Sequence, residues 1–299
     1  MASKYTRWFE EFSRKYEEFV INVYKEVAET HINNFVVCPL SLHALLGYTY
    51  FCTTGETAQQ IAYVLNLTSS RGRLPSLFQD RISFLMDPSR YVLNNVSALC
   101  VKRDFEVKDT YKQIGTNCFG TKVHNINFKN KSKSVKQINK WIEKKTCERI
   151  QKIIFETDIH SHTRAMLINA ICFQGRWRLQ FRKENTKKRR FFLRNHAEVQ
   201  TDMMETTDYF NYSVNRDLQA IFLEVPYEGN DITMTLVLPM TIDGLSTLED
   251  NIEAILAQSH CLRRVYVAIP KFRIKSSMQF QSMLEKVNTD KLTIASYVC

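Results

Sequence analysis

The chain has few of the residues that usually mark domain boundaries. Only 8 of its 299 residues are glycine and 6 are proline. No linker, low-complexity tract or internal repeat interrupts it. With 44% hydrophobic residues it can bury one large core or two modest ones. A disordered or fibrous protein is therefore excluded, and we expect one continuous domain.

Long apolar runs are also absent. The run over residues 35–46 is interrupted by a proline and a histidine, and it falls short of the roughly 18 apolar residues that a membrane helix needs. Charged residues, including Lys4, Arg7 and Glu10, lie where a signal peptide would have its apolar core. We therefore expect no membrane-spanning segment, and no signal peptide is visible.

The motifs of common enzyme classes are missing too. The sequence contains no G-x-S-x-G, G-x-x-x-x-G-K, G-x-G-x-x-G or H-E-x-x-H. His160 and His162 form the only close histidine pair and have no third ligand nearby, and the eight cysteines include no C-x-x-C pair. Scattered thiols of this kind fit a reducing compartment. A catalytic triad assembles in space, so spacing alone does not exclude one. We nevertheless expect no catalytic residue, no metal and no cofactor.

Positive charge is abundant and unevenly distributed. The net charge is +10, and residues 176–194 hold nine basic residues with Glu184 as the only acid. A second basic stretch covers residues 129–152. Like charges at this density face either solvent or a polyanion, so a heparin-like glycan, a nucleic acid and an acidic protein surface are candidate partners. A solvated loop and helix face is the alternative. The predicted polyanion site consists of Arg182, Lys183, Lys187, Lys188, Arg189 and Arg190.

The spacing of apolar residues predicts a mixed fold of helices and mainly antiparallel strands. Helices are predicted at residues 5–27, 40–51, 58–65, 108–118, 135–154, 245–257 and 278–286. Strands are predicted at residues 35–38, 91–105, 165–173, 219–227, 232–238 and 265–274. The strand at 165–173 is almost continuously apolar, which is typical of a strand covered on both faces. Asn169 lies inside it and needs buried hydrogen-bond partners.

Five segments carry a resemblance to a known family. Residues 35–42 read FVVCPLSL, 55–61 read GETAQQI, 139–142 read NKWI, 169–177 read NAICFQGRW and 224–231 read EVPYEGND. In this order they resemble the serpins, a family of serine protease inhibitors, up to about residue 286. The corresponding serpin patterns include Ser-Pro-x-Ser, Gly-x-Thr-x-x-Gln, Asn-x-Trp-Val and Asn-Ala-x-x-Phe-Lys-Gly-x-Trp. The order of the segments makes the resemblance specific.

The resemblance implies an α+β serpin fold with many helices and three mainly antiparallel sheets. It further implies a serine-type endopeptidase inhibitor that acts as a suicide substrate. A protease attacks a bait loop, and the cleaved loop inserts into the largest sheet. The expected partner is a serine protease. Most serpins are extracellular, which is the expected location, although the missing signal peptide leaves a cytoplasmic location as the alternative.

The resemblance also assigns roles to individual residues. Ser41 and Asn169 correspond to positions that hydrogen-bond beneath the opening of the main sheet. Trp177 corresponds to the aromatic residue where the loop first enters, and Lys271 to the lysine that pairs with a hinge glutamate. No counterpart of that glutamate is found in the 299 residues. Two residues depart from the family pattern, with Cys38 in place of serine and Gln174 in place of lysine.

The last residues depart from the family. Residues 287–299 form a tail without clear resemblance, and none of them corresponds to the bait loop. We therefore expect a serpin domain over residues 1–286 that is incomplete at its C-terminus, as in a truncated isoform. Such a chain is expected to be non-inhibitory as written, and to be poorly folded, prone to aggregation or dependent on a partner. A serpin-like protein that binds polyanions through its basic residues is the alternative function.

Overall fold

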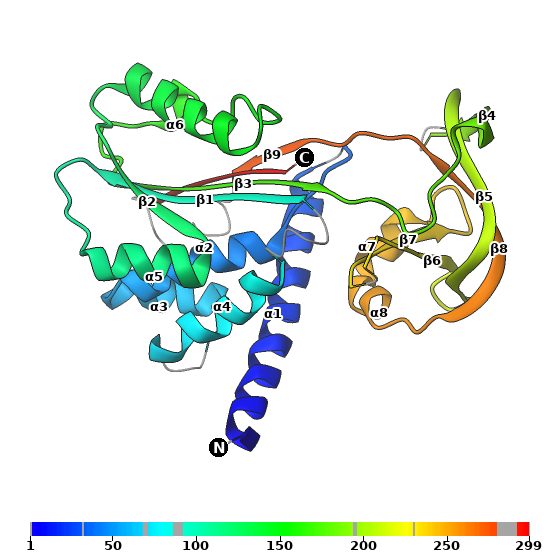
Figure 1. The fold of residues 1–299 in the computed structure, drawn as a ribbon, viewed down its shortest axis with the longest axis horizontal. Coiled ribbons are helices and arrows are strands. Elements are labelled where there is room, and N and C mark those ends of the chain that lie inside the picture. Colours follow the sequence, from blue (N-terminus) through cyan, green and yellow to red (C-terminus); the bar gives the residue numbers. More distant parts are fainter. Residues whose placement is uncertain are drawn as a thin grey trace. The chain divides into compact units, whose positions relative to one another are not determined.

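The computed structural model describes residues 2–31, 33–67, 71–85, 92–193, 196–229, 231–279 and 292–298. The chain divides into two compact units (Figure 1). Unit 1 contains Met1–Pro88, Val92–Phe173 and Ile274–Cys299, and unit 2 contains Ser89–Tyr91 and Gln174–Arg273. Unit 1 thus resumes after unit 2 along the chain. The single domain over residues 1–286 stays a prediction.

Six helices are described in unit 1. They are α1 (Ala2–Thr30), α2 (Pro39–Cys52), α3 (Gly55–Val64), α4 (Leu74–Leu85), α5 (Asp109–Phe119) and α6 (Lys131–Lys145). Helix α2 begins at Pro39, where the missing N–H costs no hydrogen bond. Figure 1 shows α6 on the opposite face of the unit 1 sheet from α2, α3, α4 and α5. Among the residues described, no helix is both long and apolar enough to cross a membrane.

The unit 1 sheet has five strands in the order β2-β1-β3-β10-β9. Their bounds are β1 Val92–Lys102, β2 Thr121–Ile126, β3 Ala165–Gln174, β9 Ser276–Gln279 and β10 Leu292–Val298. Strand β10 runs parallel to β3 and antiparallel to β9. Alternate residues of β3 enter two separate cores, with Leu167 on the α2 side and Met166 and Ile168 on the α6 side. The prediction of a strand buried on both faces is therefore confirmed.

Unit 2 is a second sheet built around one long strand. Its elements are β4 (Thr186–Phe192), β5 (Glu198–Asn215), β6 (Ala220–Pro226), β7 (Thr233–Pro239), β8 (Cys261–Pro270), α7 (Leu245–Asp250) and α8 (Ile252–Leu256). The first part of β5 pairs with β4, residues 203–212 pair with β8, and the last residues pair with β6. Strand β5 therefore connects β4 and β8 with β6 in one sheet. The strand pairs within this sheet are antiparallel. The predicted β6–β7 hairpin is confirmed.

One predicted strand is absent, and several predicted elements have other bounds, such as the strand predicted at 265–274, which is β8 over Cys261–Pro270. The structure has no strand at residues 35–38, because the backbone N–H of Val36 donates to the Ser276 hydroxyl at 2.8 Å rather than to a strand carbonyl. The helix predicted through residue 154 ends at Lys145. Cys147 and Glu148 then adopt φ values of 49° and 62°, which terminate a right-handed helix. The apolar residues that follow are still buried against α6.

The C-terminal residues differ from expectation as well. Met278 and Gln279 lie in β9 rather than in a helix, and residues 280–286 of that predicted helix lie outside the described residues. The tail from about Leu292 onward is expected to lack family resemblance, yet Leu292–Val298 form β10 between β3 and β9. The backbone of the tail thus contributes a strand to the main sheet of unit 1.

Candidate functional site

Ser41 and Asn169 meet in a buried network in unit 1. The Ser41 hydroxyl lies 2.7 Å from Asn169 Oδ1, to which it donates, and 3.0 Å from the Cys38 carbonyl. The Asn169 amide donates to Ser97 Oγ at 3.2 Å and to Asn95 Oδ1 at 3.3 Å. Ser41 is 2% exposed and Asn169 is fully buried. The structure therefore brings the two predicted residues together and supplies the partners that a buried asparagine needs.

Asn95 and Ser97 were not singled out from the sequence. Both lie on β1, and their odd positions place them on the face that also carries Leu99 and Val101, which enter the α2-side core. Polar residues at alternate positions of an otherwise apolar strand were the available signal. Only the pairing of β1 with β3 in the sheet shows that these polar side chains are hydrogen-bond partners of Asn169. Across β3 from β1, Ser296 of β10 is the register partner of Asn169.

Trp177 and Lys271 lie in unit 2. Trp177 forms an isolated β-bridge with Tyr227, and the two rings stack with centroids 4.3 Å apart and an interplanar angle of 17°. Lys271 is exposed, and its backbone N–H donates to the Asp202 carbonyl at 2.8 Å. Within the described part of the chain, no ion pair involves the Lys271 ammonium. The roles that the resemblance assigns to these two residues stay predictions.

His43 is a buried titratable residue close to Ser41 on α2. Its ring is fully buried and packs 4.9 Å from the Phe19 ring and 5.0 Å from the Phe78 ring, measured between centroids. Burial lowers the pKa of His43 to about 3. The imidazole is therefore neutral at pH 7, and it serves as part of the aromatic core.

The predicted polyanion segment forms a strand with acids opposite it. Lys188 lies 3.1 Å from the Asp202 carboxylate, and Arg190 lies 3.6 Å from that of Glu198. Lys188 and Asp202 are register partners on β4 and β5. The alternative of a solvated loop is wrong in conformation here, since a strand covers Thr186–Phe192, although nearly all its side chains are exposed to solvent. These two cations are thus partly neutralised by the neighbouring strand.

Arg189 is bound on the other face of β4. Its guanidinium donates to the two carboxylate oxygens of Glu205 at 2.7 Å and 3.4 Å. This hydrogen bond holds the pKa of Glu205 below its ordinary value, with a further contribution from the Tyr266 hydroxyl. The same partner raises the pKa of Arg189. Of the remaining predicted residues, Arg182, Lys183 and Lys187 are exposed.

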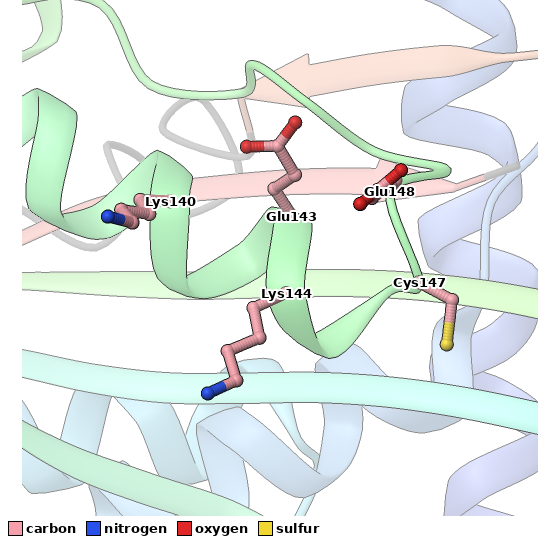
Figure 2. Close-up of a pocket in the computed structure, with 5 residues that line it drawn as sticks. All are labelled: Lys140, Glu143, Lys144, Cys147 and Glu148. Atoms are coloured by element: carbon pink, nitrogen blue, oxygen red, sulfur yellow. The ribbon is translucent and has the colours of Figure 1, made fainter.

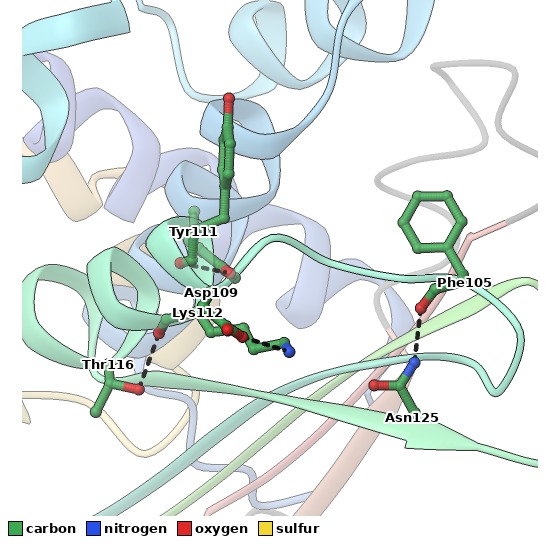
Figure 3. A network of polar contacts seen from close by, with 7 residues as sticks. Phe105, Asp109, Tyr111, Lys112, Thr116 and Asn125 are labelled. Carbon is green, nitrogen blue, oxygen red and sulfur yellow. Dashed lines mark hydrogen bonds and ion pairs between the residues drawn. The ribbon is translucent and has the colours of Figure 1, made fainter.

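A cavity of about 400 Å³ lies in unit 1 beside the start of α5. It is lined by residues of α2, β1 and α5 and by the loop that precedes α5, including Cys52, Val101, Phe105 and Tyr111. Figure 3 shows the contacts that fix this loop and helix. Asn125 Nδ2 donates to the Phe105 carbonyl at 2.7 Å, and within α5 Lys112 pairs with Asp109 at 2.9 Å. These contacts hold in place the loop and the helix that line the cavity.

No metal site is found among the residues that the structure describes. They contain no group of three or more histidine, cysteine, aspartate or glutamate side chains placed to hold an ion. The seven described cysteines are free thiols. Burial raises the pKa of Cys100 to about 12. This thiol is therefore protonated at pH 7 and is a poor nucleophile.

Comparison with known proteins places these features in a family context. A family model described as Serpin (serine protease inhibitor) matches residues 14–293. Neuroserpin of Gallus gallus is 31% identical over 281 residues, and the match covers 90% of this chain and 68% of neuroserpin. Serpin B3 of Homo sapiens is 28% identical over 290 residues, with 89% of this chain and 74% of serpin B3 covered.

Solved structures agree with the sequence comparisons. Serpin48, described as a highly specific serpin in the insect Tenebrio molitor, matches with a TM-score of 0.90 at 29% identity. The match covers 97% of this chain and 85% of Serpin48. The match therefore shows a serpin fold over nearly the whole chain.

Proposed function

The chain belongs to the serpin family, and from that premise we propose that it supplies the sheet-and-helix body of a serine-type endopeptidase inhibitor. Its expected α+β serpin fold is confirmed, although the described residues form two sheets rather than the three expected, and two strand pairs of the unit 1 sheet are parallel. Serpins are protease inhibitors rather than catalytic enzymes, so no catalytic residue is assigned. The observation that carries the proposal is the buried Ser41–Asn169 hydrogen bond at β3.

The proposed role of this bond is to hold the main sheet closed. A serpin responds to protease attack by inserting its cleaved loop into its largest sheet as an added strand. In this chain the corresponding sheet is β2-β1-β3-β10-β9, and Asn169 of β3 is tied to Ser41 of α2. Separating β3 from its neighbours displaces Asn169, so the bond resists opening. By the same resemblance, we propose Trp177 and Lys271 as residues at the loop entrance.

A double-mutant cycle tests the proposed role of the pair. We expect Ser41→Ala and Asn169→Ala to be coupled by about 0.5–3 kcal/mol of unfolding free energy, because they contact each other directly. The distinguishing readout is the rate at which an added extended peptide is incorporated, followed as a rise in melting temperature. Faster incorporation by Ser41→Ala supports a gate. Lower stability with an unchanged incorporation rate would show that the bond is structural only.

We further propose that these 299 residues by themselves trap no protease, because none of them corresponds to the bait loop. Incubation with trypsin-like and elastase-like proteases is expected to give no covalent, denaturant-resistant complex. A relative that carries its own bait loop serves as the positive control under the same conditions. A complex formed by this chain would contradict the proposal.

The location proposed from the family is extracellular, with the cytoplasm as the alternative. A tagged chain expressed in cultured cells should then be found in the medium. Retention in the cytosol would favour the alternative. Serine proteases of the matching compartment are the proposed partners.

A further inference from the structure

The cavity beside the start of α5 has no part in holding the main sheet closed. Its volume of about 400 Å³ falls within the range of small-molecule sites, which is about 300–1,000 Å³. It is lined by the end of α2, the start of α3, the end of β1, the loop before α5, the start of α5 and the start of β3. All of these segments belong to unit 1. This space is called the α5 cavity below.

The walls of the α5 cavity are mostly apolar. The apolar residues that line it are Leu99, Val101, Phe105, Val107, Tyr111 and Ala165. Leu99 and Val101 are buried, whereas Phe105 is 61% exposed and Tyr111 is 37% exposed. Figure 3 shows the rings of Phe105 and Tyr111 extending in the same direction. A ligand in this cavity therefore buries its body against aliphatic side chains and meets two aromatic rings at the solvent side.

The polar side chains that α2 contributes to the cavity offer a ligand no strong donor. The Thr49 hydroxyl donates to the Leu45 carbonyl at 2.8 Å, and the Thr53 hydroxyl donates to the Thr49 carbonyl at 2.9 Å. Burial raises the pKa of the Cys52 thiol to about 11, so this group is protonated at pH 7 and is only a weak donor. A polar ligand group placed here would lose water without gaining a good hydrogen bond. The part of a ligand that lies against α2 must therefore be apolar.

The charged residues of the lining are exposed and carry an excess of positive charge. Lys108 precedes α5, Arg164 precedes β3, and Glu106 is the acid among them. In the part of the chain that the structure describes, none of the three forms an ion pair. One guanidinium nitrogen of Arg164 donates to the His162 carbonyl at 3.3 Å, which leaves its other donors for a second acceptor. Two cations beside one carboxylate suit a ligand that carries a single negative charge.

Backbone hydrogen bonds hold the rim that carries these charges. The Lys102 N–H donates to the Arg164 carbonyl at 2.9 Å, and the Phe105 N–H donates to the Lys102 carbonyl at 2.9 Å. On the side of α5, the Tyr48 hydroxyl donates to the Tyr111 carbonyl at 3.1 Å. The backbone on both sides of the cavity is thus fixed before a ligand arrives. Binding then has to order only the exposed side chains, which keeps its entropic cost low.

We propose that the α5 cavity binds a small amphipathic monocarboxylic acid, such as a medium-chain fatty acid. The acyl chain lies against Leu99 and Val101, and the carboxylate lies at the rim beside Lys108 and Arg164. A sugar is disfavoured, because the inner walls offer few free hydrogen-bonding groups. An amphipathic cation is disfavoured by the two basic side chains. Such a site goes beyond the proposed inhibitor body, since it requires neither a protease nor a bait loop.

Calorimetric titration with octanoate, decanoate and dodecanoate tests the chemistry of the ligand. Each buried methylene group increases affinity about fourfold, so two more carbons should increase it roughly 15-fold until the cavity is full. Decanol and decylamine are the matched probes without a negative charge. We expect decanoate to bind more tightly than decanol, and decanol more tightly than decylamine. Absence of saturable binding by decanoate and dodecanoate up to about 1 mM, or equal binding of decanoate and decylamine, overturns the proposal.

Two rim variants test where the carboxylate lies. Lys108→Gln and Arg164→Gln should each weaken decanoate binding by roughly three- to tenfold and leave decanol binding within about twofold of the wild type. Arg103→Gln is the matched control, because Arg103 is an exposed cation of the same loop that does not line the cavity. It should bind decanoate as the wild type does. Equal losses in the control and the rim variants would show that net charge alone is responsible, and would reject the site.

Two further measurements locate the acyl chain. Iodoacetamide alkylates thiolates, and mass spectrometry of peptides follows each cysteine separately at about pH 9. Decanoate at ten times its dissociation constant should slow the alkylation of Cys52 about tenfold and leave that of the exposed Cys147 unchanged.

The variant Thr57→Phe places a ring in the lining and should weaken decanoate binding at least about tenfold. Its circular dichroism shows whether it is folded, and if it is not, the protection of Cys52 in the wild type decides. Decanoate binding that leaves Cys52 unprotected would place the ligand elsewhere and overturn the proposal.

Discussion

Strand β4 and helix α6 are the two most basic segments of the chain, and the structure treats their charge differently. On β4, Lys188, Arg189 and Arg190 each lie within 4 Å of an acid of β5. On α6, four exposed lysines form no ion pair with the described residues. They lie at spacings of three and four residues and are called the α6 lysine row below: Lys133, Lys136, Lys140 and Lys144. The number of basic residues in a segment therefore does not tell how much unpaired positive charge that segment exposes to solvent. What matters is which element packs beside the basic one.

The geometry of strands and helices explains the difference. Side chains opposite each other on antiparallel strands are about 4.5–5.5 Å apart, so Asp202 of β5 lies beside its register partner Lys188. Longer reaches pair Arg189 with Glu205 and Arg190 with Glu198, whereas Lys187 faces Met203.

The outer face of a helix that covers a sheet has no neighbouring element. Its charges can be neutralised only by its own residues at i,i+3 or i,i+4, or by a ligand. In α6 those positions hold mainly lysines, and Glu143, at i+3 from Lys140, forms no ion pair with it among the described residues. Figure 2 shows the Glu143 carboxylate pointing away from the ammonium groups of Lys140 and Lys144.

Removing the acids of β5 should abolish the difference, and this is the largest effect we expect. The triple variant Glu198→Gln, Asp202→Asn, Glu205→Gln exposes the charge of β4. It is combined with the fourfold α6 variant, in which every member of the α6 lysine row is changed to glutamine. The combination should gain a salt dependence of heparin binding of roughly 40-fold between about 50 and 200 mM NaCl. Salt titration of the dissociation constant measures this gain. No gain would mean that β4 is shielded by something other than its acids.

Reversing one charge on α6 should sharpen the comparison. Lys140→Glu turns the repulsion of Lys140 by Lys136 and Lys144, at i,i+4 spacing, into two attractions, so the free energy of unfolding should rise by about 1 kcal/mol. Lys145→Glu is the control, because no lysine of α6 lies three or four residues from it and the C-terminal end of a helix disfavours acids. Urea unfolding compares the two variants. An equal rise in both would show that the α6 lysine row is not a set of mutually repelling charges.

Lowering the pH should reduce the stability that the ion pair between Arg189 of β4 and Glu205 of β5 contributes, whereas α6 has no such ion pair among the described residues. The folded-state pKa of Glu205 lies below its ordinary value of 4.5. The stability that its pair with Arg189 contributes is present above pH 4.5 and is lost as the pH falls through the lower folded-state pKa. Melting temperatures over about pH 7 to 3 should therefore fall less steeply for Glu205→Gln than for the wild type. The fourfold α6 variant should follow the wild-type slope, and a shared change in slope would contradict this assignment.

The smallest effect is expected from the α6 lysines on stability. Changing all four to glutamine relieves like-charge repulsion, so the free energy of unfolding should stay within about 0.5 kcal/mol of wild type or rise slightly. Urea unfolding measures it. Destabilisation by about 2 kcal/mol or more would show that the lysines have structural partners, and that outcome would contradict the comparison with β4.

Much of the fold was predictable because it depends on local patterns. Apolar spacing predicted α1 and α2, and the continuous apolar run predicted β3. The turn at Gly229 between two apolar runs predicted the β6–β7 hairpin. These signals depend on neighbours within one element or one turn, which is the range over which periodicity carries information.

The rest depended on partners that are distant in sequence. The apolar residues after Lys145 continue the helical spacing of α6, but left-handed residues at Cys147 and Glu148 end the helix and let the chain turn back. Strand β10 was not predicted from the sequence, and its assignment rests on backbone pairing with β3. Asn95 and Ser97 became site residues only because β1 lies beside β3.

The sequence by itself determined the serpin family and the order of many elements, because these follow from motifs and local periodicity. The resemblance pointed to Ser41 and Asn169, but the hydrogen bond between them was decided by the tertiary structure. The sequence also determined that two segments are basic. Only the tertiary structure decided that β4 lies opposite the acids of β5 while α6 faces outward with its lysines unpaired. The physical reason is that ion pairs depend on distance in space, which the order of residues does not specify.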